Sequence, residues 1–308
     1  MRILPNRRIE GQSAVLLPIR DDGRPDYDTL AMLIRRTADA GLVPAVNMDT
    51  GYANLISDEE RVEVLKIARQ VLAGKPFTAG AFVEGRPGDP VPHYLRQVAE
   101  IQEHGGTPIL FQCTALKGMS GPDVVKVYEA VAKASPRFYA FELGEMFAPF
   151  GRIYDLETVR ALMGIPACVG MKHSSLSRRQ EWDRLDLRDR VRPDFKVYTG
   201  NDLAIDMVMY GSDYLLGISA FWPEAFAKRD RWWAEGDARF YELNDLLQYL
   251  GFFAFRPPVP AYKHSAAMFL HLRGVIPNDL THPRAPKRPE SDRGVLQDIA
   301  ERIARMMS

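Results

Sequence analysis

A lysine closes a short apolar run in the segment VGMKHSS, Val169–Ser175. If this run is a buried strand, Lys172 lies at its carboxyl end, where desolvation lowers the pKa of an ammonium group. A neutral lysine amine can attack a ketone and form a Schiff base. Side chains alternate along a strand, so Gly170 shares the face of Lys172 and is expected to leave room for a substrate. A strand-end lysine can also extend to solvent with no chemical role. The segments expected to lie near Lys172 must distinguish a catalytic lysine from a solvent-exposed one.

Two further segments carry groups that suit a small anionic ligand. The segment NMDTGYANL, Asn47–Leu55, offers the hydroxyl of Thr50 and the backbone N–H of Gly51 to a carboxylate. The segment GISAF, Gly217–Phe221, has small residues that a ligand can approach closely. An ordinary capped turn and tight packing are the structural alternatives for these two segments.

Short apolar runs alternate with amphipathic segments and so predict the elements that position these groups. The runs are continuously apolar, as expected of strands covered on both faces. The expected strands are Ser13–Pro18, Leu42–Asn47, Phe77–Phe82, Thr107–Gln112, Phe138–Leu143, Cys168–Lys172, Lys196–Thr199 and Tyr214–Ile218. The expected helices between and after them are Tyr27–Ala40, Asp58–Ala73, Pro92–Glu103, Gly121–Ala134, Leu156–Met163, Asn201–Tyr210 and Glu224–Glu235.

Eight such units predict an α/β fold, a (β/α)8 TIM barrel over residues 1–225. A doubly wound open sheet is the main competitor, but no GxGxxG follows the first strand. After residue 225 the pattern is purely helical, at Ala238–Phe253, Ala261–Leu272 and Asp292–Met307. This pattern predicts a C-terminal helical subdomain over residues 226–308. Lys172 then lies at the end of the barrel where active sites are built.

Composition bounds the class of protein. The 308 residues are 46% hydrophobic and contain 40 basic and 40 acidic side chains, a balance that argues against nucleic acid or an anionic membrane as the main partner. The two cysteines form no CxxC pair and the N-terminus has no apolar signal region, so a cytoplasmic protein with reduced thiols is expected. The six histidines show no ligand spacing, so we expect no metal ion or other cofactor.

Four motifs, in order along nearly the whole chain, resemble the dihydrodipicolinate synthase and N-acetylneuraminate lyase family of Schiff-base lyases. NMDTGYANLISDEER is similar to the family's GTTGE segment, and VGMKHSS to the motif around its Schiff-base lysine. TGNDLAIDMVMYGSDYLLGISAFWPE and RPPVPAYKHSAAMFLHLRG are similar to its two later motifs. The resemblance implies a barrel with a helical extension, usually in homotetramers or dimers. It further implies that Lys172 forms the Schiff base with a 2-keto acid such as pyruvate, that Thr50 and Gly51 hold its carboxylate, and that the backbone around Leu216 lines the pocket.

The sequence also departs from the family pattern. The catalytic tyrosine of strand five is missing, and an ungapped alignment puts Glu142 in its place. A buried carboxylate can relay protons, so Glu142 is the expected general acid/base, with a salt bridge to Arg152 or another cation as the alternative. Asp49 replaces the first threonine of the GTTGE segment and is expected to contact substrate. His173 follows Lys172 and should therefore face the helices as a buried structural residue.

These features predict a lyase, aldolase or hydro-lyase acting on a 2-keto acid or keto-sugar acid, but not the lysine-pathway synthase itself. The tyrosine pair that follows strand four in the family, and the arginine that binds its second substrate, have no counterparts. Residues considered for the distal end of the substrate are Lys117, Tyr52, Phe147, Arg152 and Trp222. The alternatives are a non-catalytic descendant that binds a keto acid as a sensor or assembly partner, and a phosphate-binding barrel enzyme without covalent catalysis.

Overall fold

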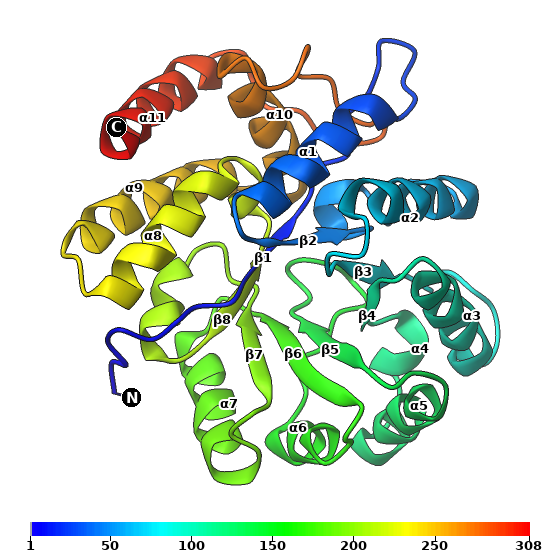
Figure 1. Ribbon diagram of the computed structural model, residues 1–308. Helices are drawn as coiled ribbons and strands as arrows, with labels where there is room; N and C mark the ends of the chain where they lie inside the picture. The colour runs from blue at the N-terminus through cyan, green and yellow to red at the C-terminus, as the bar shows by residue number, and fades with distance from the viewer. Residues whose placement is uncertain (1) are drawn as a thin grey trace.

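The computed structural model describes residues 2–308 and contains a closed barrel of eight parallel strands, each paired with its neighbours in chain order (Figure 1). The strands are β1 Gly11–Ala14, β2 Val43–Val46, β3 Thr78–Ala81, β4 Thr107–Leu110, β5 Phe138–Leu143, β6 Cys168–Ser174, β7 Lys196–Thr199 and β8 Asp213–Leu216. Pairing of β1 with both β2 and β8 closes the sheet. The predicted (β/α)8 barrel is therefore confirmed, and the open sheet is excluded.

Helices cover the outside of the barrel. They are α1 Tyr27–Asp39, α2 Asp58–Leu72, α3 Pro90–Glu103, α4 Thr114–Lys117, α5 Gly121–Ala134, α6 Leu156–Met163, α7 Arg178–Val191 and α8 Pro223–Glu235. Short 3-10 turns, η1 Asp49–Gly51, η2 Ile205–Tyr210 and η3 Ile218–Ala220, follow β2, β7 and β8. The start of α2 is fixed by a reciprocal capping box between Ser57 and Glu60, a pattern already visible in the sequence.

Helix α7 was not predicted, and its composition explains why. Its sequence, RRQEWDRLDLRDRV, lacks the apolar stripe that marks an amphipathic helix. The residues that α7 buries against the barrel include Glu181, Arg184 and Arg188, so its inner face is largely charged. The helix expected at Asn201–Tyr210 is shorter, because only the 3-10 turn η2 forms there.

Three further helices, α9 Arg239–Ala254, α10 Tyr262–Leu272 and α11 Asp292–Met307, gather on one side of the barrel beside α8 (Figure 1). The short turn η4, Val259–Ala261, leads into α10. The expected boundary between residues 225 and 226 falls inside α8, and a division into two domains stays a prediction. Within residues 2–308, no helix is long and apolar enough to cross a membrane.

Candidate active site

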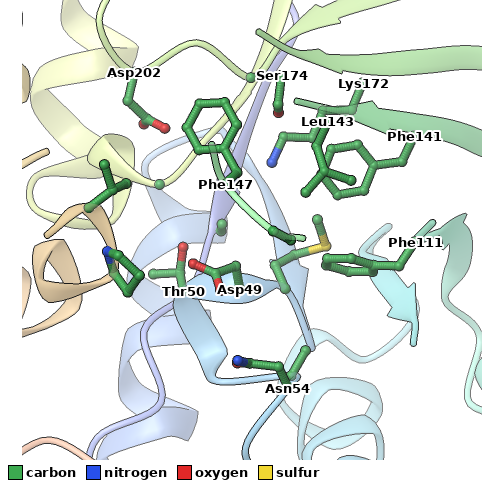
Figure 2. Close-up of a pocket in the computed structure, with 18 of the residues that line it drawn as sticks. Asp49, Thr50, Asn54, Phe111, Phe141, Leu143, Phe147, Lys172, Ser174 and Asp202 are labelled. Atoms are coloured by element: carbon green, nitrogen blue, oxygen red, sulfur yellow. The ribbon is translucent and has the colours of Figure 1, made fainter. Parts of the chain in front are cut away.

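A cavity of about 300 Å³ opens at the carboxyl ends of the strands, the end that holds active sites in this fold (Figure 2). Side chains from β1, β5 and β6 line it, together with residues that follow each of the strands β2, β3, β4, β5, β7 and β8 and residues just before and at the start of α10. Its polar members include Asp49, Thr50, Lys172, Ser174 and Asp202. Phenylalanines supply much of the remaining wall.

Lys172 projects from β6 into this cavity, with its amine pointing toward the centre (Figure 2). The amine nitrogen lies 4.7 Å from the centre of the Phe141 ring. Gly200, at the end of β7, makes room for the lysine: a Cβ there would lie 2.6 Å from Cε of Lys172. Burial lowers the pKa of Lys172 to about 8, although the charges of Asp202 and Asp49 act in the opposite direction. A substantial share of the amine is therefore neutral at slightly alkaline pH.

Asp202 lines the same cavity from the segment between β7 and η2 (Figure 2). Its carboxylate accepts a hydrogen bond of 2.7 Å from the backbone N–H of Ile218. Burial raises the pKa of Asp202 to about 6, against the opposing effects of that hydrogen bond and of Lys172. The site therefore holds an acid and an amine that both titrate near neutral pH.

Asp49 and Thr50 belong to η1 and are connected through a tyrosine of α10. The Tyr262 hydroxyl donates to Asp49 Oδ2 over 2.9 Å and lies 2.9 Å from Thr50 Oγ1. Because the one proton of Tyr262 goes to Asp49, the hydrogen of Thr50 must point to Tyr262. The three residues thus form a directed chain from Thr50 through Tyr262 to the Asp49 carboxylate.

Lys263, the next residue of α10, holds the end of this chain. Its Nζ donates to Asp49 Oδ2 over 2.8 Å, and its own side chain is almost fully buried. Desolvation in the cavity favours the neutral acid, but the charge and hydrogen bond of Lys263, together with Tyr262 and Lys172, keep the pKa of Asp49 below its usual value. The Asp49 side chain is 53% exposed, which places its free surface toward the cavity.

The Tyr262 ring is held in place by close packing. It stacks on Phe255 with ring centres 4.2 Å apart and planes inclined by 15°. Gly217, after β8, permits this position, since a Cβ there would lie 3.1 Å from the Tyr262 ring and 3.3 Å from Thr50 Oγ1. Glycine at position 217 therefore leaves room for the contact between Tyr262 and Thr50.

Two sequence expectations need revision at this point, those for Gly51 and Gly170. Gly51 does not line the cavity, and its N–H donates to the Met48 carbonyl over 2.9 Å instead of facing a ligand. The backbone around Leu216 reaches the cavity at Gly217, as expected, while the Leu216 side chain packs in the core outside the barrel. Gly170 makes room for β7, not for substrate, because a Cβ there would meet Lys196 at 2.7 Å.

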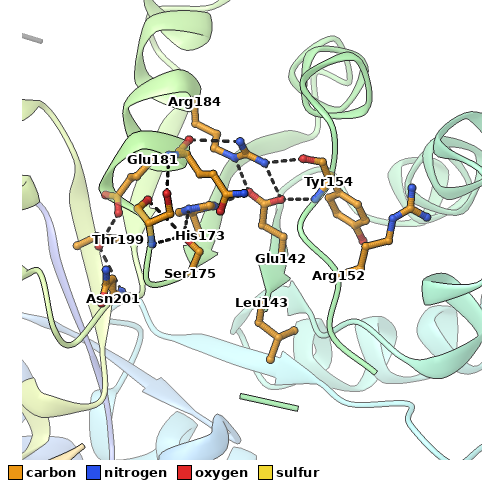
Figure 3. A network of polar contacts seen from close by, with 12 residues as sticks. Glu142, Leu143, Arg152, Tyr154, His173, Ser175, Glu181, Arg184, Thr199 and Asn201 are labelled. Carbon is orange, nitrogen blue, oxygen red and sulfur yellow. Dashed lines mark hydrogen bonds and ion pairs between the residues drawn. The ribbon is translucent and has the colours of Figure 1, made fainter. Parts of the chain in front are cut away.

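Glu142 lies outside the cavity, which corrects its assignment as the general acid/base. Its neighbour Phe141 faces the cavity, so strand alternation turns Glu142 toward the helices, where it is fully buried (Figure 3). Its carboxylate accepts hydrogen bonds from Arg184 over 2.7 and 3.2 Å and from the Tyr154 backbone over 2.7 Å. The alternative interpretation, a salt bridge to a cation, is the one observed, with Arg184 as the cation.

His173 completes this buried network on the helix side of β6, as alternation predicted. Its Nδ1 lies 2.6 Å from Glu142 Oε1 and its Nε2 2.7 Å from Ser175 Oγ (Figure 3). Burial alone would raise the pKa of Glu142, but His173 and Arg184 lower it to about 2. Glu142 is therefore an anion at neutral pH, and its hydrogen bonds connect β5 and β6 to α7.

Of the five residues considered for the distal end of the substrate, only Phe147 lines the cavity. Arg152 donates to the Met119 carbonyl, and Lys117 donates to the Pro149 carbonyl over 2.6 Å and pairs with Glu145. Within residues 2–308, Lys172 is the only cationic residue that lines the cavity.

Sequence reasoning missed Asp202, Tyr262 and Lys263 as members of the site. All three lie within segments whose similarity to the family was recognised, TGND and PAYKH. That similarity carried no role for them, and the contact between α10 and η1 spans more than 200 residues of chain. Groups of three or more residues able to hold a metal ion are absent from the described chain.

Comparison with known proteins agrees with the fold. A family described as "Protein of unknown function (DUF993)" matches residues 86–280, more than half of the chain. A 4-hydroxy-tetrahydrodipicolinate synthase of Kosmotoga olearia is 26% identical over 211 residues, covering 67% of this chain and 68% of that protein.

Solved structures match over almost the full length. Dihydrodipicolinate synthase from Thermotoga maritima superimposes with a TM-score of 0.82 at 18% identity, covering 97% of this chain and 99% of that one. A prophage protein of the same family from E. coli K12, in complex with pyruvate, gives a TM-score of 0.83 at 17% identity, with coverages of 96% and 98%. The chain therefore belongs to the DUF993 family and is a divergent member of the dihydrodipicolinate synthase family.

Proposed function

We propose that this protein is a lyase or aldolase that binds a 2-keto acid such as pyruvate as a Schiff base on Lys172. The observation that carries the proposal is a lysine with a pKa of about 8 inside a cavity at the carboxyl end of the barrel. The pyruvate bound in the E. coli relative's structure supports the choice of ligand class.

In the first step the neutral Lys172 amine adds to the keto carbon. Loss of that carbonyl oxygen as water leaves an imine. The imine nitrogen takes up a proton and then withdraws electrons from C3, so a C3 proton passes to a base and a neutral enamine forms. The enamine carbon then attacks an aldehyde, whose oxygen takes up a proton and becomes a hydroxyl. Water finally hydrolyses the imine, which frees the 4-hydroxy-2-keto acid and Lys172; cleavage is the reverse.

The proton carrier in this scheme is the chain of Thr50, Tyr262 and Asp49. Thr50 lines the cavity, and its hydroxyl connects through Tyr262 to a carboxylate that Lys263 keeps ionised. This route replaces the tyrosines that the family supplies from strands four and five. Because the hydrogen of Thr50 points to Tyr262, Ser174 is the hydroxyl free to donate to the keto acid's carboxylate. The roles of Asp49 and Thr50 toward substrate are part of the proposal.

Exchange of the C3 protons of pyruvate with deuterated water tests the function without knowledge of the second substrate. Pyruvate and enzyme are mixed in D2O, and the methyl signal is followed by proton NMR. We expect wild-type protein to remove the signal and Lys172→Arg to leave it at the buffer rate. Loss of the signal at equal rates in both proteins would refute the role of Lys172.

The same measurement separates this function from that of a non-catalytic descendant. A protein that only senses a keto acid binds pyruvate without exchanging its protons. Saturable binding with no exchange would therefore favour the sensor.

A further inference from the structure

We propose that the group attached beyond the keto acid in the true substrate is uncharged and aryl-sized, and that a wall of five phenylalanines holds it. This inference rests on the proposed Schiff-base function and names the class of the second substrate, an apolar aldehyde. The wall, called here the phenylalanine wall, consists of Phe82, Phe111, Phe141, Phe147 and Phe150, all of which line the cavity.

Four of these rings form a continuous series leading away from Lys172. The lysine amine lies over Phe141, and Phe141 packs edge-on against Phe111 with ring centres 5.0 Å apart. Phe111 meets Phe82 at 5.5 Å, and Phe82 meets Phe150 at 6.0 Å, again edge to face. A substituent that leaves the imine in this direction lies against a largely aromatic and aliphatic surface, which favours apolar and aromatic groups.

The loop after β5 supplies two of the rings and is fastened over the cavity. Gly144 donates to the Ser174 carbonyl over 2.9 Å, and Arg152 returns to bridge with Leu143. Phe147 and Phe150 are only partly buried among the inner barrel cluster, so they keep surface free for a ligand. Figure 2 shows Phe147 in front of the space between Asp202 and Lys172.

Charge in the cavity opposes a second carboxylate. In the Schiff base the Lys172 nitrogen is bonded to C2, beside the keto acid's own carboxylate, and none of the other described residues that line the cavity is cationic. Asp49 and Asp202 add negative charge at the same site. A substrate with a distal carboxylate would bring an unpaired charge into a low-dielectric space, which is unfavourable. An uncharged substituent carries no such cost.

Competitive trapping on Lys172 tests the inference. The probes are 4-phenyl-2-oxobutanoate, the deoxy analogue of the aldol product of benzaldehyde, and 2-oxoadipate, which ends in a carboxylate. Equal concentrations compete for the protein, borohydride reduces the imines to stable amines, and mass spectrometry compares the two adducts. Pyruvate, trapped in a separate sample, reports on the Schiff-base function itself.

We expect the phenyl adduct to exceed the 2-oxoadipate adduct at least about tenfold, as burial of an aromatic group predicts. Phe150→Ala should reduce this ratio several-fold, and Phe150→Arg should shift it toward 2-oxoadipate by supplying the missing cation. Phe252→Ala is the matched control, because Phe252 is 55% exposed on α9, and its ratio should equal that of wild type.

Each contrary result has a distinct meaning. A pyruvate adduct without preference for the phenyl probe overturns the inference and leaves the proposed function standing. A phenyl preference that Phe150→Ala and Phe150→Arg do not change overturns the role of the wall. No adduct with any probe, from folded protein, refutes the proposed function and the inference with it.

Discussion

At the scale of single residues, the pKa of Lys172 sets the pH dependence of the reaction. Only the neutral amine attacks the ketone, and its pKa of about 8 means that the neutral fraction rises through that pH. We therefore expect the pyruvate exchange rate at low pyruvate to climb between about pH 7 and 9 with a midpoint near 8. A rate that still climbs beyond pH 10, as for an ordinary lysine, would contradict the lowered pKa.

The Asp202 carboxylate moves this midpoint in a known direction. Its negative charge raises the pKa of Lys172, so Asp202→Asn should lower the pKa and shift the pH profile to lower pH. Asparagine keeps an oxygen that can accept the hydrogen bond from Ile218. A profile that stays in place or moves to higher pH would show that Asp202 does not act on the amine.

At the scale of elements, Glu142 joins β5 and β6 to α7 and should govern stability. Breaking a buried ion pair by removing one partner costs about 3–5 kcal/mol, so Glu142→Gln should lower the free energy of unfolding by that order. Urea denaturation measures the change, with Glu63→Gln as control, since Glu63 pairs only with exposed Lys66 on α2. The folded Glu142→Gln protein should exchange pyruvate protons at the wild-type rate. A large drop in this exchange rate would show that Glu142 takes part in catalysis.

The pH dependence of stability has a definite sign here. The pKa of Glu142 is about 2 in the folded protein, against 4.5 for an ordinary glutamate. Its contribution is therefore fully present above about pH 4.5 and lost as the pH falls toward 2. Glu142→Gln should remove this part of the acid sensitivity, and acid titrations of both proteins would reveal an unchanged slope if the assignment is wrong.

Elements with apolar patterns could be predicted from the sequence, and elements with polar packing could not. β5, β7, α5 and α11 were located to the residue because each shows a clear apolar run or stripe. Helix α7 could not be predicted because its buried residues Arg184 and Glu181 are charged. Their hydrogen-bond partners lie elsewhere in the barrel: Glu142 on β5, Thr199 on β7 and Ser212 directly before β8. The role of Glu142 was predicted wrongly for the same reason, because its ion-pair partner Arg184 lies on this unpredicted helix.

The site itself was predicted in part. Lys172 and Thr50 lie in recognisable motifs at strand ends, where the fold directs them to one cavity. Tyr262 and Lys263 are brought there by tertiary packing alone, because no periodicity in the sequence relates α10 to η1. The phenylalanine wall assembles in the same way, from one residue of β5, the residues that directly follow β3 and β4, and the loop after β5.

At the scale of the whole molecule, the helical extension completes the barrel's site. Tyr262→Phe keeps the ring that stacks on Phe255 but removes the hydroxyl between Thr50 and Asp49. Loss of a general acid/base group slows proton transfer by about 100-fold or more. We expect borohydride trapping of pyruvate to persist in this variant while proton exchange falls by that factor. Tyr249→Phe, on the exposed face of α9, is the control; equal exchange in both variants would refute the relay.

The expected assembly into homo-oligomers also belongs to this scale. The side chains of Tyr241, Tyr249 and Phe252 on α9 are each about half exposed. Light scattering of the purified protein should give a multiple of the 34.8 kDa chain mass. A single chain mass at micromolar concentration would contradict the expectation.

The most direct test of the account is to trap pyruvate on the enzyme and locate the modified residue. Protein incubated with pyruvate is reduced with borohydride, digested and analysed by peptide mass spectrometry. The account predicts one adduct, on the peptide that contains Lys172, and none in Lys172→Arg. An adduct on another lysine such as Lys263, or none on Lys172 in folded wild-type protein, would contradict it.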